Sequence, residues 1–154
     1  MKDSRPTWDE YFMNIAVETS KRSSCIRRQI GAVLVKDKRI LATGYNGAPS
    51  KIKPCIHSEC IRAKLNIPSG ERHEICKAVH AEENAILQCA KYGISTIGGK
   101  IYVTTSPCSK CVKAILQVEI SEVIYPKEIN YPDQLSLNLI EESGIKITPL
   151  VYQL

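Results

Sequence analysis

Hydrophobic residues recur at helical spacing near the start of the chain, in the stretch TWDEYFMNIAVETSKRS. Five of them fall on one helical face: Trp8, Tyr11, Phe12, Ile15 and Ala16. Thr7 or Asp9 can cap the start of this helix. The following stretch, GAVLVKDKRILATGYNG, has two apolar runs separated by a polar KDK turn, which predicts two antiparallel strands. The chain therefore begins with a helix and a hairpin.

The pattern changes at about residue 48. From there to about residue 76 the chain is polar and rich in Pro, Lys and Cys, with one short helical piece around SECIRAKLN. We expect this segment, called the insertion below, to have little core of its own within a single domain spanning residues 1–154.

Helical and strand patterns alternate after the insertion. The helical stretches are VHAEENAILQCAKYG, SPCSKCVKAILQ and DQLSLNLIEESG, and the strands are KIYVTT, EVIYP and IKITPLV. Such alternation implies right-handed crossovers between parallel neighbours. The sequence therefore predicts an α/β fold with a mixed five-stranded sheet and helices on both faces.

Composition narrows the class of protein. The 154 residues suffice for one domain, and 44% hydrophobic and 24% charged residues are ordinary for a folded globular protein. There is no apolar run of membrane-spanning length and no secretory signal, so we expect a cytoplasmic protein. The net charge of +5 is scattered and aromatics are only 6%, which makes nucleic acid an unfavoured partner. Seven cysteines in such a chain indicate metal binding or catalysis rather than disulfides.

The pair Cys108 and Cys111 has three plausible meanings: a redox couple, half of a structural zinc site, or part of a catalytic zinc site. Ser106 can cap the helix that follows and Pro107 can occupy its first turn, so both sulfurs would lie where the helix dipole favours thiolate. His80 begins another helix. If the two helices pack side by side, one imidazole and two thiolates leave the fourth zinc position for water, as in catalytic sites.

A proton acceptor must accompany such a zinc ion. Glu82, two residues after His80, is placed for this task, because water on zinc loses a proton near neutral pH. Glu83 should face elsewhere as a surface charge. A His-x-Glu sequence followed by Pro-Cys-x-x-Cys is the signature of zinc-dependent nucleobase deaminases.

With these motifs and with GYNGAP at residues 44–49, the chain resembles the deoxycytidylate (dCMP) deaminase family, in its bacterial late-competence branch. The resemblance covers nearly the whole chain. It implies a three-layer cytidine-deaminase-like fold and zinc-dependent hydrolysis of dCMP to dUMP and ammonia, which supplies thymidylate synthesis. It also implies a hexamer, dCTP and dTTP as effectors, and Mg²⁺ as companion of a triphosphate effector.

The same resemblance suggests how the substrate is held. Asn46 would hydrogen-bond the sugar, and backbone groups near Ala81 and Ser106 would grip the edge of the base. Arg27 or Arg28 is the candidate for the 5′-phosphate. Tyr131 is a candidate wall of the pocket, although a solvated arginine or a packed tyrosine would fit the sequence equally well.

The remaining cysteines suggest a second, structural zinc, because a segment so poor in apolar residues can be ordered by a metal. We expect its ligands in and beside the insertion: Cys25, Cys55, His73 and Cys76. Cys60 is the alternative for one sulfur position, and Cys89 is expected in the core.

Two other functions remain open at this stage. One is a related deaminase of the same fold that acts on another base or on a free nucleoside. The other, suggested by the late-competence resemblance and the positive charge, is a non-catalytic zinc-binding accessory protein for DNA uptake.

Overall fold

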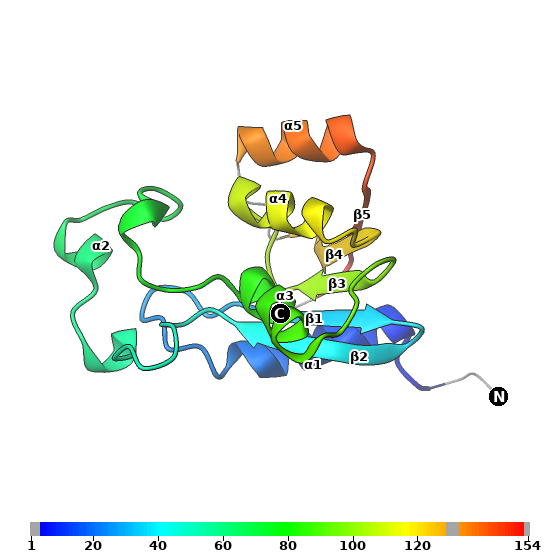
Figure 1. Ribbon diagram of the computed structural model, residues 1–154, viewed down its shortest axis with the longest axis horizontal. Coiled ribbons are helices and arrows are strands. Elements are labelled where there is room, and N and C mark those ends of the chain that lie inside the picture. The colour runs from blue at the N-terminus through cyan, green and yellow to red at the C-terminus, as the bar shows by residue number, and fades with distance from the viewer. Residues whose placement is uncertain (1–3, 129–132, 153–154) are drawn as a thin grey trace.

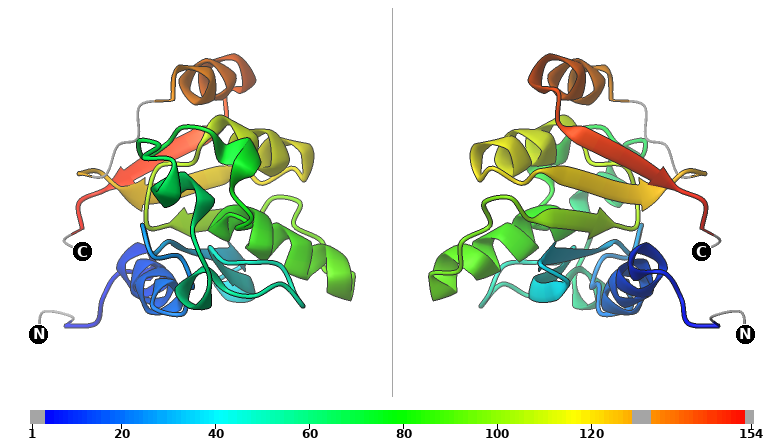
Figure 2. Two further views of the ribbon diagram at one scale, coloured as in Figure 1. Left: turned by 90° about the vertical axis from the view of Figure 1, so that its left-hand side faces the viewer. Right: turned by 90° about the vertical axis from the view of Figure 1, so that its right-hand side faces the viewer.

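The computed structural model describes residues 4–128 and 133–152 (Figure 1). Its strands form one mixed sheet in the order β2-β1-β3-β4-β5, which Figure 2 shows stacked from one edge to the other. The strands are β1 Gly31–Lys36, β2 Arg39–Tyr45, β3 Lys100–Val103, β4 Glu122–Pro126 and β5 Lys146–Leu150. β1 pairs antiparallel with both β2 and β3, whereas β3, β4 and β5 run parallel. The predicted hairpin and the predicted parallel part of the sheet are confirmed.

Four longer helices accompany the sheet: α1 Trp8–Ser20, α3 Ala81–Tyr92, α4 Ser109–Gln117 and α5 Gln134–Ser143. The insertion holds the short helix α2 Ile61–Lys64 and two 3-10 turns, η1 Cys55–His57 and η2 His73–Ile75. Each helix expected from the periodicity is present. Within the described ranges no helix is long and apolar enough to cross a membrane.

The sheet buries side chains on both faces, because successive residues of a strand point in opposite directions. Val33 and Tyr102 pack with Phe12 of α1 on one face. Leu34 and Ile101 pack on the other, with residues of α3 and α4. The structure therefore has the helix–sheet–helix layering expected from the sequence.

Of the two caps predicted for α1, Thr7 is the one used. Its side chain accepts a hydrogen bond from the backbone of Glu10, whose carboxylate accepts one from the backbone of Thr7 at 2.7 Å. Such a capping box satisfies two of the backbone N–H groups that a helix start leaves unpaired. Asp9 has another task, since it accepts a hydrogen bond from the hydroxyl of Tyr102 on β3 at 2.7 Å.

Glycines allow two helices to lie directly on the hairpin strands. A Cβ atom on Gly44 of β2 would be 2.2 Å from the carbonyl oxygen of Ala81 and 2.5 Å from the nitrogen of Ala85, both in α3. A Cβ on Gly31 of β1 would be 2.0 Å from the carbonyl oxygen of Ala16 in α1. These contacts fix the depth at which each helix lies on the sheet.

The insertion extends beyond the sheet on the side where α3 begins (Figure 1). Cys55 is its one buried residue, in agreement with the prediction of little core. The insertion is tied to the rest of the domain by backbone hydrogen bonds, such as the one that the N–H of Ile56 donates to the carbonyl of Ser24 at 3.1 Å. An isolated bridge between Gly47 and Val79 closes its two ends.

Candidate metal centre and active site

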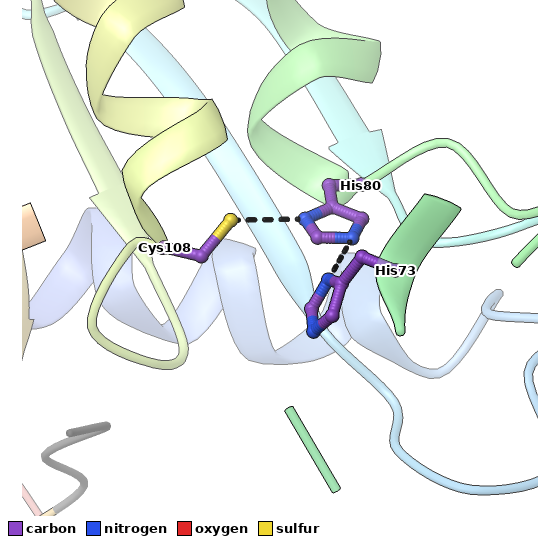
Figure 3. A group of neighbouring side chains, drawn as sticks. All are labelled: His73, His80 and Cys108. Carbon is purple, nitrogen blue, oxygen red and sulfur yellow. Dashed lines mark hydrogen bonds between the residues drawn. The ribbon is translucent and has the colours of Figure 1, made fainter. Parts of the chain in front are cut away.

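The structure brings the start of α3 and the start of α4 together (Figure 3). His80 is the residue before α3, Cys108 is the residue before α4, and Cys111 lies in the first turn of α4. The Nδ1 atom of His80 lies 3.4 Å from the Sγ atom of Cys108 and 3.4 Å from that of Cys111. Three groups that are far apart in sequence therefore converge as the sequence predicted.

These distances fit zinc. Zinc bonds to sulfur at about 2.3 Å and to imidazole nitrogen at about 2.0–2.1 Å, so two such ligands at a tetrahedral angle lie about 3.6 Å apart. One nitrogen and two sulfurs are also a ligand set that zinc prefers, with a fourth position left for water or substrate. The residues present therefore suit a catalytic zinc ion held through Nδ1 of His80 and the two thiolates.

The thiols of Cys108 and Cys111 have pKa values shifted in opposite directions. The hydrogen bond with Cys111 lowers the pKa of Cys108 to about 4, assisted by His80 against the effect of burial. The hydrogen bond with Cys108 and burial together raise the pKa of Cys111. Because zinc binds cysteine as thiolate, metal binding must displace the proton that stays on Cys111.

Glu82 lies beside this centre in the first turn of α3. Only 3% of it is exposed, and a carboxylate oxygen forms a compact group with the ligand atoms of His80 and Cys111, all within 4.8 Å of one another. Burial raises the pKa of Glu82 to about 7. A carboxyl group with this pKa can both accept and return a proton near neutral pH. Glu83, as expected, is occupied elsewhere, in an ion pair with Lys110 at 3.0 Å.

His73 differs from its prediction as a structural zinc ligand. Its Nδ1 atom lies 3.2 Å from the Nε2 atom of His80, whereas the sulfur of Cys108 lies at the other ring nitrogen, Nδ1 (Figure 3). Burial, and then His80, lower the pKa of His73, while Cys108 and the backbone of Gly70 oppose this. His73 therefore contacts a residue of the metal centre, and its ring could accept the hydrogen bond that Nε2 of a metal-bound imidazole donates.

The predicted ligands Cys25, Cys55 and Cys76 are not gathered into a closed site. Within residues 4–128 and 133–152, every group of three or more potential ligands within 4.8 Å of one another includes His80. That these cysteines and His73 share one metal stays a prediction, and in this structure His73 lies against His80 instead of among the cysteines. Cys89 lies in the core, 1% exposed, as expected.

A pocket opens above the metal centre, and the predicted substrate-binding residues within the described chain all line it: Arg27, Arg28, Asn46, Ala81 and Ser106. They share its wall with His80, Glu82 and Cys108. Arg28 donates to the hydroxyl of Thr105 at 3.2 Å. Tyr131 falls outside the described residues.

Asn46 has a structural task in addition to any contact with substrate. Its Oδ1 accepts hydrogen bonds from the hydroxyl of Ser23 at 2.6 Å and from the backbone of Ile30 at 2.8 Å. Its Nδ2 donates to the carbonyl of Arg28 at 2.8 Å. An amide can make four hydrogen bonds, and the three named above, all among residues that the structure describes, use one of the two N–H groups of Asn46.

The start of α4 differs from its prediction. Ser106 and Pro107 precede the helix, which begins at Ser109 with Cys108 as its N-cap residue. The carboxylate of Asp133 accepts the hydrogen bond from the backbone of Ser109 at 2.7 Å. Since Asp133 also caps α5 through Ser136 at 3.0 Å, one carboxylate stabilises both helix starts.

Sequence reasoning missed the contribution of the insertion to the pocket. Arg62, Ser69 and Gly70 line it alongside His73. No periodicity marks such residues, because they lie in turns whose position is set by contacts with distant segments. One sequence signal for this contribution was Arg62, a basic residue in an insertion that was already expected to hold metal ligands.

The family comparison agrees with this geometry. Residues 6–127 match the model of the cytidine and deoxycytidylate deaminase zinc-binding region. A deoxycytidylate deaminase of Mycobacterium phage D29 is 45% identical over 130 residues, which cover 81% of this chain and 98% of the relative. ComE operon protein 2 of Bacillus subtilis is 36% identical over 143 residues, 93% of this chain and 71% of that protein. This match agrees with the late-competence resemblance.

Two further similarities bear on length and fold. The deoxycytidylate deaminase of Schizosaccharomyces pombe is 36% identical over 143 residues, 93% of this chain, but the chain spans only 44% of that relative. The crystal structure of the dCMP deaminase of cyanophage S-TIM5 in complex with dCMP and dUMP superimposes with a TM-score of 0.77 at 29% identity, covering 96% of this chain and 100% of that one. With the zinc-binding motifs in place, the chain belongs to the cytidine and deoxycytidylate deaminase family.

Proposed function

We propose that the chain is a zinc-dependent dCMP deaminase, which hydrolyses dCMP to dUMP and ammonia. The observation that carries this proposal is the buried carboxyl group of Glu82 beside His80 and the two thiols, in the lining of a pocket that arginines also line. The names of the relatives and the nucleotides bound in the cyanophage structure support dCMP as the substrate.

His80, Cys108 and Cys111 would hold the zinc ion, which when bound lowers the pKa of water toward neutrality. Glu82 accepts a proton from the attacking water, since its own pKa is about 7. It delivers that proton to ring nitrogen N3 as the water oxygen adds to C4. It then takes the remaining proton of the former water from the new hydroxyl on C4 and delivers it to the amino group, so that the C4–N bond breaks, ammonia leaves and the C4 carbonyl of dUMP forms. Because Glu82 is 3% exposed, these protons are exchanged with the substrate rather than with bulk solvent.

The upper pocket would orient the nucleotide. Backbone groups at Ala81 and Ser106, which line the pocket, would hydrogen-bond the base, and an N–H of Asn46 would hydrogen-bond the sugar. Each of these groups is fixed by the start of a helix or by the end of β2, so little ordering is needed when the substrate binds.

The direct test is release of ammonia by the zinc-loaded protein from dCMP, deoxycytidine, cytidine, guanine and dCTP, measured side by side. We expect turnover to be fastest with dCMP. Glu82→Gln should abolish it while zinc stays bound, and Glu83→Gln, a matched change one residue away, should leave it nearly intact. Preference for another substrate would favour the related-deaminase reading, and lack of turnover with all five would favour the non-catalytic one.

We also propose a structural zinc with a revised ligand set, in which Cys60 replaces His73. Burial raises the pKa of the Cys55 thiol, Lys77 opposes this, and the charges of Cys25, Cys60 and Cys76 add to the rise. Four thiols near one another in a poorly packed segment can be drawn together by a metal whose binding free energy becomes folding free energy. We expect two zinc ions per chain, falling to one in Cys55→Ser, whereas Cys89→Ser should keep both.

The hexamer, the dCTP and dTTP effectors and the accompanying Mg²⁺ stay predictions from the family resemblance. Sedimentation with and without the two triphosphates tests the oligomeric state. dCMP turnover under the same conditions tests whether the triphosphates act as effectors.

A further inference from the structure

Helix α5 buries a polar residue where it packs on α4 (Figure 1). Of residues 134–143, Ser136 is the one that is buried, with 3% of it exposed. The apolar side chains of Leu135 and Leu137 are 48% and 47% exposed. Because a buried hydroxyl costs free energy unless it is hydrogen-bonded, the partner of Ser136 shows how α5 is attached.

The start of α5 holds both peptide groups that flank Cys108. The hydroxyl of Ser136 donates to the carbonyl of Pro107 at 2.9 Å in a buried contact, and this carbonyl belongs to the peptide group before Cys108. The carboxylate of Asp133 accepts from the N–H of Ser109 at 2.7 Å, and this N–H belongs to the peptide group after Cys108. Asp133 also accepts from the backbone of Ser136 at 3.0 Å, which joins the two contacts into one unit.

Cys108 occupies the N-cap position of α4, where a side chain ordinarily accepts a hydrogen bond from the first turn of the helix. Its side chain makes no such cap bond in the described chain, and its sulfur lies 3.4 Å from Nδ1 of His80. Asp133 supplies an acceptor from another helix, so the helix start is capped while the sulfur is left for a metal. Hydrogen bonds to both flanking peptide groups restrict the backbone dihedral angles of Cys108, on which the direction of its side chain depends.

We propose that Asp133 and Ser136 are positioning residues for the metal centre, which hold Cys108 in the geometry of a zinc ligand before the ion arrives. A ligand that is already oriented loses less conformational entropy when the metal binds. Outer contacts that orient a ligand are typically worth about 10- to 100-fold in metal affinity. The inference rests on the zinc site of the proposed function and not on its substrate.

The test is the zinc affinity of Asp133→Ala and Ser136→Ala, measured by competition with a chromophoric chelator. Binding at this centre is identified by its loss in Cys108→Ser. We expect the affinity to fall about 10- to 100-fold in Asp133→Ala and Ser136→Ala. Asp133→Asn keeps one acceptor oxygen and should lie between wild type and Asp133→Ala. The absorption bands of Co²⁺ bound in place of zinc, which depend on ligand geometry, should shift in the same variants.

Two controls separate positioning from stability. Thr7→Ala removes the cap of α1, which carries no ligand of this centre. Ser143→Ala removes a hydroxyl at the other end of α5, where it donates to the carbonyl of Ile140 at 3.1 Å. Both should keep wild-type zinc affinity. Urea unfolding of the metal-free proteins should show similar losses of stability in Thr7→Ala and Asp133→Ala, so that weaker zinc binding in Asp133→Ala alone follows from the position of Cys108.

Wild-type zinc affinity in both Asp133→Ala and Ser136→Ala would overturn the proposal, as would an equal loss in Thr7→Ala. Loss in one of the two variants would keep the role for that residue and overturn it for the other. None of these outcomes touches the proposed function if the wild-type protein deaminates dCMP. A wild-type protein that binds zinc here and shows the expected losses in the variants, but does not deaminate dCMP, would refute the proposed function and leave the positioning role standing.

Discussion

Gly44→Ala should impair the metal centre without touching any ligand. The added Cβ would lie 2.2 Å from the carbonyl oxygen of Ala81, whereas Cβ atoms essentially never come within 3.0 Å of such an atom. The start of α3 must therefore retreat by about 0.8 Å, the difference between these two distances. His80 and Glu82 are on this part of the chain, and a displacement of about 1 Å can cost about a hundredfold in rate.

The cost in stability should be on the order of 1 to 3 kcal/mol, as is typical for overpacking. Gly31→Ala is the matched control, because its Cβ would lie 2.0 Å from the carbonyl oxygen of Ala16 and would displace α1, which carries no metal ligand. Urea unfolding of the two variants should give similar losses. Competition with a chromophoric chelator should show weaker zinc binding for Gly44→Ala alone, and dCMP turnover should fall in the same variant.

The reasoning fails if Gly44→Ala, folded and assayed well below its melting temperature, keeps wild-type zinc affinity and turnover. It also fails if Gly31→Ala weakens zinc to the same extent, since the effect would then follow from lost stability rather than from the position of α3.

Three further outcomes are expected. Glu82→Gln should lower kcat for dCMP about 100- to 10,000-fold with zinc content unchanged, measured by metal analysis and steady-state kinetics. Asn46→Ala, which removes three hydrogen bonds between the loop before β1 and the end of β2, should cost on the order of 2 to 4 kcal/mol in urea unfolding. Burial raises the pKa of Glu122, but hydrogen bonds from Lys100, Thr148 and Lys146 outweigh it and bring the pKa from 4.5 to about 2. The ionised carboxylate should therefore add on the order of 2 to 3 kcal/mol above pH 4.5, lost as the pH falls through about 2, so wild type and Glu122→Gln should converge in acid.

The elements of the fold could be predicted because their signals are local. The helical spacing of Trp8 to Ala16 and the polar turn in the hairpin depend on residues close in sequence. The convergence of His80, Cys108 and Cys111 is not local, but chemistry makes it predictable: a metal needs several ligands, and few side chains in the chain can serve. Both predictions agree with the structure for these reasons.

The start of α4 and the role of His73 could not be predicted in the same way. Ser106 is a good local cap, yet Asp133 from the start of α5 pairs with the backbone of Ser109 instead. His73 has the sequence features of a structural ligand, but the fold places it against the free nitrogen of His80. In both cases a contact between distant segments decides among local options that the sequence leaves nearly equal.

The insertion shows how a segment poor in core residues can still be held in place. Its one buried residue is Cys55, so little apolar burial holds it in place. What orders it instead are polar contacts such as those of Arg27 with Ile67 and Arg62 with Pro68, which also fix guanidinium groups around the pocket. The family resemblance makes Arg27 a candidate for the 5′-phosphate, so binding of the nucleotide should stabilise the contact of Arg27 with Ile67 and with it the insertion. Protection of the insertion from hydrogen exchange should therefore rise with dUMP and not with deoxyuridine.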